Sequence, residues 1–227
     1  MKRIREIDIM RVTAMLLMVI YHVLYDLNNF VGLDIRYYSL PLSLIGKLSA
    51  IIFIFLSGIS SGLGSNVIKR GAIVFGSGML VTLVTFIGFK DSFVVFGILH
   101  LLGVCMMMSS FINKTPIWVL VILILLSMVI GWYFNCITSE AWILLPFGVS
   151  YEGFNSFDYY PIFPDISVFI GGTIYYRIFY KDKKSIFNLK AKNDIIEKLS
   201  RKSLLIYLVH QPVIVGIIYI VAFIRKQ

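Results

Sequence analysis

Long apolar runs alternate with short polar segments along almost the whole chain. The runs predict seven helices, at 10–30, 41–63, 71–88, 92–111, 116–134, 161–180 and 202–224. Each is close to the ~20 residues that a helix needs to cross the hydrocarbon core of a bilayer. The pattern therefore predicts an all-α fold, a polytopic transmembrane helix bundle of about seven spans, organised as a single domain over residues 1–227.

Composition supports a membrane protein. Of the 227 residues, 59% are hydrophobic and only 15% are charged, whereas a soluble domain is about a quarter charged. Mean hydropathy is +0.88. The net charge of +9 would suit nucleic acid, but the basic residues gather at the ends of alternate apolar runs, which is a topology signal. Nucleic acid is therefore excluded as a partner, and the lipid bilayer is expected instead.

Basic residues also predict the orientation in the cell (plasma) membrane. Basic residues flank the predicted spans at four places on one side. They precede the first run (Lys2, Arg3, Arg5, Arg11), follow the second (Lys69, Arg70) and follow the fourth (Lys114). Eight more, from Lys181 to Lys202, precede the seventh run. The opposite ends carry only Arg36, Lys90, Arg225 and Lys226. This bias predicts a cytoplasmic N-terminus and an external segment at 135–160, in which 141–149 is expected to form a re-entrant or interfacial hairpin.

All three histidines lie inside apolar runs. His22, His100 and His210 each sit in the interior of a predicted span, where an ionisable ring costs free energy. They indicate a buried reaction centre or conduction path. The alternative is an interhelical hydrogen bond, worth less than ~2 kcal/mol. We expect His100 and His210 to support or bind a substrate rather than to react, together with Gln211, which precedes Pro212 and a predicted kink.

The first run carries a polar stripe. Arg11 and His22 are eleven residues apart, about three turns or ~16 Å, and Asp8 and Asp26 fall on the same side. Arg11 could bind a phosphate, and His22 could act as a general base with Asp26 orienting its ring. The alternative is a helix end with snorkelling charges and a histidine bonded to a neighbouring helix.

Further candidates lie outside this stripe. Lys47 and the small residues Ser57 and Gly58 fall in the second run, where they could pass a ligand, or simply snorkel and allow close helix packing. Asp158 and Tyr160 belong to an acidic, aromatic rim suited to sugars or amines, with an ordinary interfacial aromatic belt as the alternative. Cys105 and Cys136 are at different predicted depths, so no disulfide is expected, and no metal-ligand spacing occurs.

Several stretches together resemble a known family. RIREIDIMRVTAMLLMVIYHVLYDL, FIFLSGISSGLG, FGILHLLGVCMM, FDYYPIFPDISVFIGG and LSRKSLLIYLVHQPVI are similar to segments of the prokaryotic relatives of heparan-alpha-glucosaminide N-acetyltransferase. The ten residues between Arg11 and His22, the Ser57-Gly58 pair and the YLVHQP ending also resemble the acyltransferase 3 family. Both belong to one group of transmembrane acyltransferases.

The resemblance implies acetyl transfer from cytoplasmic acetyl-CoA, without a metal, to an amino sugar or glycan acceptor at or beyond the membrane. By position, Arg11 and His22 match the arginine and the histidine of the acyltransferase 3 motif. Asp8, Arg11, Ser57, Gly58, Arg201 and Lys202 would then bind the co-substrate. Lys47, His100, Asp158, Tyr160, His210 and Gln211 would bind the acceptor, with His22 and Asp26 catalytic. The chain departs from the group in having seven runs rather than about ten, and in having Asp34 but no histidine in the loop after the first run.

Three interpretations stay open at this point. In an acyltransferase, His22 could be a base or could itself be acylated. A proton-coupled transporter or permease could use the same intramembrane His and Asp residues, although no internal repeat is present. A structural membrane subunit is the third. The oligomeric state is open, with a homodimer as the candidate.

Overall fold

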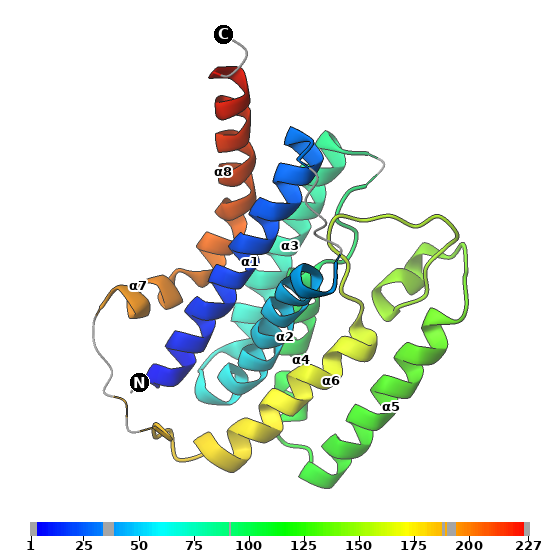
Figure 1. Ribbon diagram of the computed structural model, residues 1–227. Coiled ribbons are helices and arrows are strands. Elements are labelled where there is room, and N and C mark those ends of the chain that lie inside the picture. Colours follow the sequence, from blue (N-terminus) through cyan, green and yellow to red (C-terminus); the bar gives the residue numbers. More distant parts are fainter. Residues whose placement is uncertain (1–3, 34–38, 91, 188, 190–193, 225–227) are drawn as a thin grey trace. The chain divides into compact units, whose positions relative to one another are not determined.

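The computed structural model describes residues 4–33, 39–90, 92–187, 189 and 194–224, with the side chains of 222–224 excepted. The regular elements within these residues are helical (Figure 1). They are α1 (Arg5–Val31), α2 (Leu40–Leu63), α3 (Val67–Gly88), α4 (Ile98–Ile112), α5 (Ile117–Asn135), the 3₁₀ helix η1 (Trp142–Phe147), α6 (Ile162–Tyr175), the π-helix η2 (Tyr176–Tyr180), α7 (Ile195–Arg201) and α8 (Ser203–Ile224). The all-α prediction is confirmed.

Each predicted apolar run contains a helix, and most boundaries agree within a few residues. The fourth run differs most, because α4 begins at Ile98 rather than at 92. The preceding segment is extended: Phe96 accepts a backbone bond from Tyr160 at 2.9 Å, and Ser92 accepts one from Phe157 at 3.1 Å. The sequence did not predict α7, and the segment at 141–149 holds the short helix η1, which Gly148 ends in a left-handed conformation (φ 115°).

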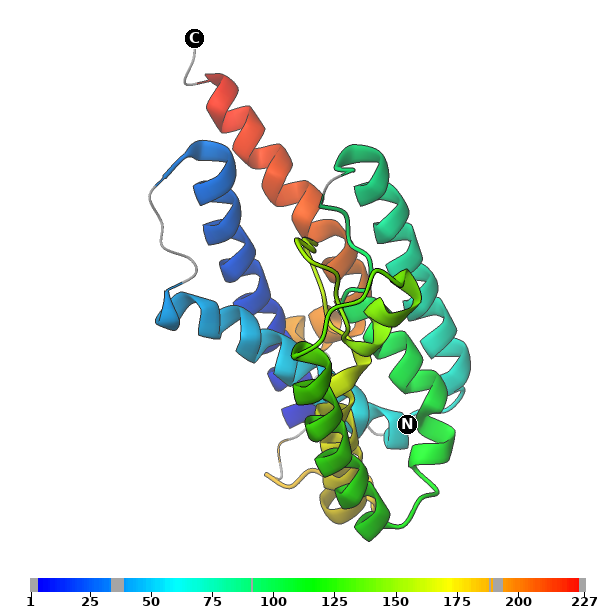
Figure 2. The same cartoon turned by 90° about the vertical axis from the view of Figure 1, so that its right-hand side faces the viewer.

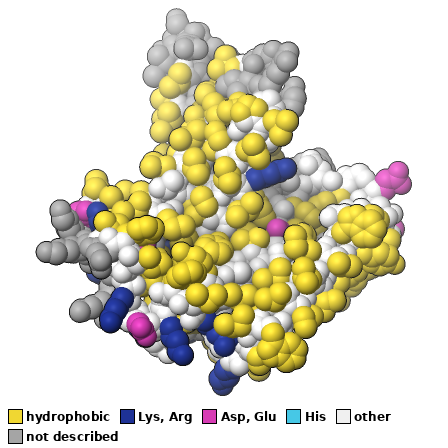
Figure 3. Space-filling view, turned by 60° about the horizontal axis from the view of Figure 1, so that its bottom comes forward, with side chains coloured by type: hydrophobic (Ala, Val, Ile, Leu, Met, Phe, Trp, Pro, Cys, Tyr) yellow, Lys and Arg dark blue, Asp and Glu magenta, His cyan; other side chains and the backbone are white. Residues whose placement is uncertain are grey.

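Five helices are long and apolar enough to cross a membrane in the part of the chain that the structure describes: α1, α2, α3, α5 and α8. The helix α4 is shorter, with 15 residues, and the 14 residues of α6 continue into η2. Large hydrophobic side chains cover much of the surface in Figure 3, as expected for helices that face lipid.

The chain forms two compact units. The terminal unit consists of Met1–Phe53 and Phe187–Gln227, and so combines α1, the first part of α2, α7 and α8. In it α1 packs against both α7 and α8. The hydroxyl of Ser49 on α2 donates to the Ala14 carbonyl of α1 at 2.9 Å, and the ring of Tyr21 packs on the bare backbone of Gly46.

The central unit, Ile54–Ile186, is held together by small residues. A side chain at Gly103 of α4 would meet the backbone of Phe75 on α3, since an added Cβ would lie 2.7 Å from the Phe75 nitrogen. Gly131 of α5 packs in the same way on Pro164 of α6. Without a hydrophobic drive between helices in lipid, such close backbone approach supplies the packing energy.

The close packing of α3 and α4 can be tested with two glycines. We expect Gly103→Ala to destabilise the protein by about 1–3 kcal/mol, because its Cβ would overlap Phe75 backbone atoms. Gly76→Ala on α3 is the matched control, because no atom lies within 4 Å of its Cβ and alanine stabilises a helix interior by about 0.5–1 kcal/mol relative to glycine. Thermal unfolding in detergent measures both; equal effects would contradict the packing.

Candidate active site

Two of the three histidines in the apolar runs meet inside the terminal unit. The ring centroids of His22 on α1 and His210 on α8 lie 4.8 Å apart, with the ring planes inclined by 57°. Both rings are half-buried. The helices that carry them, α1 and α8, pack against each other within the terminal unit (Figures 1 and 2). The first and last long helices of the chain therefore bring two imidazoles into contact.

A backbone contact fixes which ring nitrogen of His210 carries hydrogen. Its Nδ1 is hydrogen-bonded to the carbonyl oxygen of Tyr207, three residues earlier in α8. A carbonyl oxygen only accepts, so Nδ1 must donate, and in the neutral ring Nε2 holds the lone pair. This Nε2 is buried and has no hydrogen-bond partner among the described residues. α8 thus presents a basic nitrogen that these residues leave unsatisfied.

One turn further along α1, Asp26 is bonded to Gln211 of α8. The Gln211 amide nitrogen donates to both carboxylate oxygens at 3.0 Å, and Asp26 is 0% exposed. An ionised carboxylate only accepts, so the amide nitrogen must face it and the amide oxygen Oε1 must point elsewhere. That Oε1 is also buried and, within the part of the chain described, unpartnered.

Energetics favour a functional interpretation of these four residues, His22, Asp26, His210 and Gln211, which we name the α1–α8 polar cluster. An aspartate at the centre of a membrane helix costs about 2.5–3.5 kcal/mol. Interhelical hydrogen bonds in membranes average about 0.6 kcal/mol, so the two bonds from Gln211 recover about 1.2 kcal/mol. Two unsatisfied buried acceptors add a further cost. These bonds do not recover the full cost of burying the cluster, which favours a role in chemistry or binding over a role in stability.

The contacts within this cluster differ from those predicted. The sequence predicts that Asp26 orients the ring of His22, but the structure bonds Asp26 to Gln211, whose amide supplies two N–H donors. The ring of His22 contacts His210 and the edge of Tyr21, at 5.9 Å. α8 also continues through Pro212, where a kink was predicted. Proline has no N–H, so it cannot bond the carbonyl one turn earlier.

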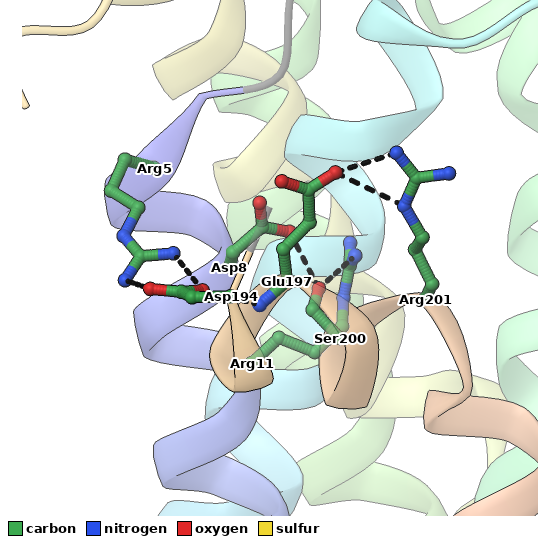
Figure 4. Close-up of polar contacts among 7 residues, drawn as sticks. All are labelled: Arg5, Asp8, Arg11, Asp194, Glu197, Ser200 and Arg201. Carbon is green, nitrogen blue, oxygen red and sulfur yellow. Dashed lines mark hydrogen bonds and ion pairs between the residues drawn. The ribbon is translucent and has the colours of Figure 1, made fainter. Parts of the chain in front are cut away.

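A second set of polar residues joins the N-terminal part of α1 to α7 (Figure 4). Ser200 donates its hydroxyl to Asp8 Oδ1 at 2.6 Å and accepts from Arg11 Nη1 at 3.2 Å. Asp8 and Ser200 are buried, and Arg11 is half-buried. We name Asp8, Arg11 and Ser200 the α1–α7 polar cluster. Sequence analysis missed Ser200, because a single serine in a basic loop carries no distinguishing signal.

A salt bridge holds the start of α7 beside this cluster. Both terminal nitrogens of Arg5 donate to the Asp194 carboxylate, with Nη1 at 2.7 Å from Oδ1. Asp194 is also the N-cap of α7 and accepts from the Glu197 backbone N–H at 3.1 Å. The hydrogen bond from Arg5 is the main reason that the pKa of Asp194 falls from 3.8 to about 2, and the Glu197 N–H lowers this pKa further.

The predicted phosphate ligands Arg201 and Lys202 lie at the end of α7. Arg201 pairs with Glu197 at 2.5 Å while its side chain remains 61% exposed, and Lys202 is exposed. Arg201 and Lys202 are therefore close to Ser200 in the sequence, at the same end of α7, but unlike Ser200 their side chains are exposed to solvent. Lys2, Arg3, Asp34, Arg36, Lys190, Lys192, Arg225 and Lys226, which entered the topology or site predictions, lie outside the described residues.

The candidates on α2 fall in different units. Lys47 is exposed on the part of α2 that belongs to the terminal unit. Ser57 and Gly58 belong to the central unit, where Ser57 is half-buried and Gly58 is buried. A Cβ at Gly58 would lie 2.1 Å from the Phe169 carbonyl oxygen of α6. The geometry gives Gly58 a role in close packing, which was one of its two predicted roles.

His100, Asp158 and Tyr160, also in the central unit, hold the start of α4. His100 Nδ1 accepts from the Gly97 backbone N–H at 3.1 Å, and its Nε2 lies 3.3 Å from the hydroxyl of Thr82. Asp158 accepts the Ile98 backbone N–H at 2.9 Å. Both ring nitrogens of His100 are therefore satisfied, unlike His210 Nε2. Within the described residues, no group of three or more His, Cys, Asp or Glu could hold a metal ion.

Apolar helices with a buried polar cluster between two of them define a multi-pass membrane protein with a candidate site inside its terminal unit. The chain belongs to the family described as heparan-alpha-glucosaminide N-acetyltransferase, catalytic, whose sequence profile matches residues 3–212. The resemblance noted from the motifs is thus confirmed, and at the level of the family the protein is a transmembrane acetyltransferase. No curated protein and no solved structure gives a significant match.

Protonation of Asp194 at low pH should weaken the contacts that hold the start of α7 against α1. Its pKa is lower in the folded protein than in the unfolded chain, so its stabilising effect is complete above pH ~4. This effect is lost as pH falls from about 4 towards 2. We expect amide hydrogen exchange across Ile195–Arg201, corrected for intrinsic rates, to accelerate over that window. In Asp194→Asn the same amides should exchange faster at pH 6 and respond less to acid; an identical acid response would contradict this role.

Proposed function

We propose that this protein transfers an acetyl group from acetyl-CoA, taken up from the cytoplasmic side, to an amino-sugar or hydroxyl acceptor at or beyond the membrane. The whole chain would act as one acyltransferase domain in the plasma membrane, with its N-terminus in the cytoplasm. The observation that carries the proposal is the contact between the half-buried rings of His22 and His210, in a member of an acetyltransferase family.

His22 is the proposed reacting group. Acetyl transfer requires a group near the thioester carbon that takes a proton from the acceptor or accepts the acetyl group itself. His22 lies on α1, and α1 also carries Arg11 nearer its N-terminal end. A donor that enters along α1 would meet the guanidinium of Arg11 before it meets the imidazole of His22, as binding of acetyl-CoA through a phosphate requires.

The co-substrate site is proposed at Asp8, Arg11, Arg201 and Lys202, all of which belong to the terminal unit. The α1–α7 polar cluster supports part of this, because Ser200 and Asp8 fix the guanidinium of Arg11 at the end of α1. A planar guanidinium held in this way offers paired donors to a phosphate. Lys47, exposed on the part of α2 that belongs to the terminal unit, is proposed to serve the acceptor.

Acetyl-CoA should raise the unfolding temperature of the purified protein. A ligand that binds only the folded state at 100 times its Kd stabilises that state by about 2.7 kcal/mol. We expect His22→Ala to keep this thermal shift and to lose acetyl transfer, since the imidazole reacts with the bound donor rather than holding it. Leu16→Ala, at an exposed position of α1 (59%), is the matched control and should transfer acetyl groups normally.

Two outcomes would reject the proposal. One is a protein with no thermal response to acetyl-CoA that dissipates a pH gradient in liposomes, because intramembrane His and Asp residues also form proton relays. The other is a His22→Ala variant that is folded and fully active. The first outcome would favour a proton-coupled transporter.

Arg11 should contribute to the binding of acetyl-CoA through its fork of donors. Loss of a hydrogen bond to a charged group costs about 1.5–3 kcal/mol, so Arg11→Ala is expected to weaken acetyl-CoA binding about 10- to 100-fold. Arg11→Lys keeps the positive charge but lacks the paired N–H donors of the guanidinium, so its Kd for acetyl-CoA should lie between those of the unsubstituted protein and Arg11→Ala. Isothermal titration measures the Kd values, with Lys198→Ala, exposed on α7, as control. An unchanged Kd together with faster amide exchange in α7 would show that Arg11 only anchors that helix.

A further inference from the structure

The α1–α8 polar cluster contains two buried acceptor atoms that the proposed function has not used. They are Nε2 of His210 and Oε1 of Gln211, and neither has a hydrogen-bond partner among the described residues. Their partners on α1, His22 and Asp26, are one helical turn apart, which separates the Cβ atoms of those two partners by about 6 Å. The two atoms therefore belong to neighbouring layers of one interface.

The chemistry of these atoms restricts what can bind them. With Nδ1 donating to Tyr207, the neutral His210 ring can only accept at Nε2. The Gln211 oxygen is an acceptor as well. A ligand that satisfies both must therefore bring two hydrogen-bond donors. A thioester carbonyl is an acceptor and cannot fill this role, whereas an amine beside a hydroxyl group can.

The basicity of His210 Nε2 favours the acceptor over acetyl-CoA as the ligand of this nitrogen. The amide N–H groups of a pantetheine arm keep their hydrogens throughout the reaction, so a basic nitrogen gives them no special advantage. The nucleophile of the acceptor must lose a proton as it attacks, and a base in contact with it lowers that barrier, typically by 10²–10⁴ in rate. The position of this nitrogen beside His22, the proposed reacting group, fits the nucleophile.

Resting on the proposed function, we propose that α8 binds the acceptor: His210 Nε2 takes the proton of the attacking amine, and Gln211 Oε1 accepts a hydrogen bond from a neighbouring hydroxyl group. Asp26 is a positioning residue, because its two bonds from the Gln211 amide nitrogen turn the amide oxygen towards the acceptor.

The step balances without a further reactant. The amine nitrogen forms a bond to the acetyl carbon, and its proton passes to His210 Nε2. The bond from the acetyl carbon to the ring nitrogen of His22 breaks. His22 has taken the acetyl group from CoA in a first step, in which the C–S bond breaks and CoA leaves as the thiol with the ring proton of His22. The proton on His210 then passes to that leaving group, and the neutral ring is restored.

The first test separates acceptor from donor. His210→Asn retains an amide N–H near the Nδ1 position for the Tyr207 carbonyl and removes the acceptor at Nε2. With the full chain in nanodiscs and glucosamine as probe, we expect kcat/KM for glucosamine to fall at least about 100-fold. The Kd of acetyl-CoA should change less than twofold. Val209→Ala, exposed on α8 (44%), is the control and should match the unsubstituted protein in both quantities.

Asp26→Asn tests positioning. It removes one of the two acceptors for the Gln211 amide nitrogen while keeping the size of the side chain, so the amide oxygen is held less firmly. We expect a higher KM for glucosamine with kcat retained within a few-fold, whereas a general loss of folding would lower kcat and acetyl-CoA binding together. A KM that does not change in the folded variant would contradict the role of Asp26.

A direct measurement covers the case in which glucosamine is not acetylated. With ¹⁵N-labelled histidine, glucosamine alone should move the Nε2 resonance that disappears in His210→Asn. An unmoved resonance overturns the α8 site, as does a His210→Asn variant that weakens acetyl-CoA binding as much as glucosamine use. These results are distinct from failure of the proposed function, in which the unsubstituted protein neither binds acetyl-CoA nor transfers its acetyl group.

Discussion

The bond between Asp26 and Gln211 sets the register of the terminal unit. A carboxylate that is 0% exposed between apolar helices must be paired, and the amide of Gln211 provides both of its hydrogen bonds. Because Gln211 must meet Asp26, the preceding residue of α8 meets the residue one turn earlier on α1, and His210 comes to lie against His22. A shift of one turn would separate both pairs at once, so the polar pair fixes the geometry of the two imidazoles.

α1 anchors two other helices through its polar stripe. Near its N-terminal end, Arg5 and Asp8 bond to Asp194 and Ser200 of the α7 segment. Nearer its C-terminal end, its His and Asp residues meet α8. Since α7 and α8 are consecutive in the chain, these contacts hold one continuous stretch against α1. This arrangement explains why charges persist on an otherwise apolar helix: each one in this stripe has a partner on the C-terminal segment.

The histidines illustrate two uses of one side chain in an apolar setting. His100 bonds through both ring nitrogens, to Gly97 and Thr82, and so completes the first turn of α4. His210 uses one nitrogen for its own helix and leaves the other unsatisfied. The hydrogen bonds of a fully bonded ring offset the free-energy cost of burying it, whereas a buried ring nitrogen without a partner adds to that cost. This difference, rather than depth in the span, is what separates a packing histidine from a candidate reactive one.

The sequence alone determined the helical class, the positions of the apolar helices, the polar stripe of α1 and the family, because each depends on local periodicity, composition or short motifs. Only the tertiary structure decided the partners. Asp26 and Gln211 are far apart in the chain and no spacing rule pairs them, so the sequence joined Asp26 to His22, its neighbour on the same helix face. Ser200 was hidden for the same reason: its hydrogen bond to Asp8 joins distant segments and leaves no pattern along the chain.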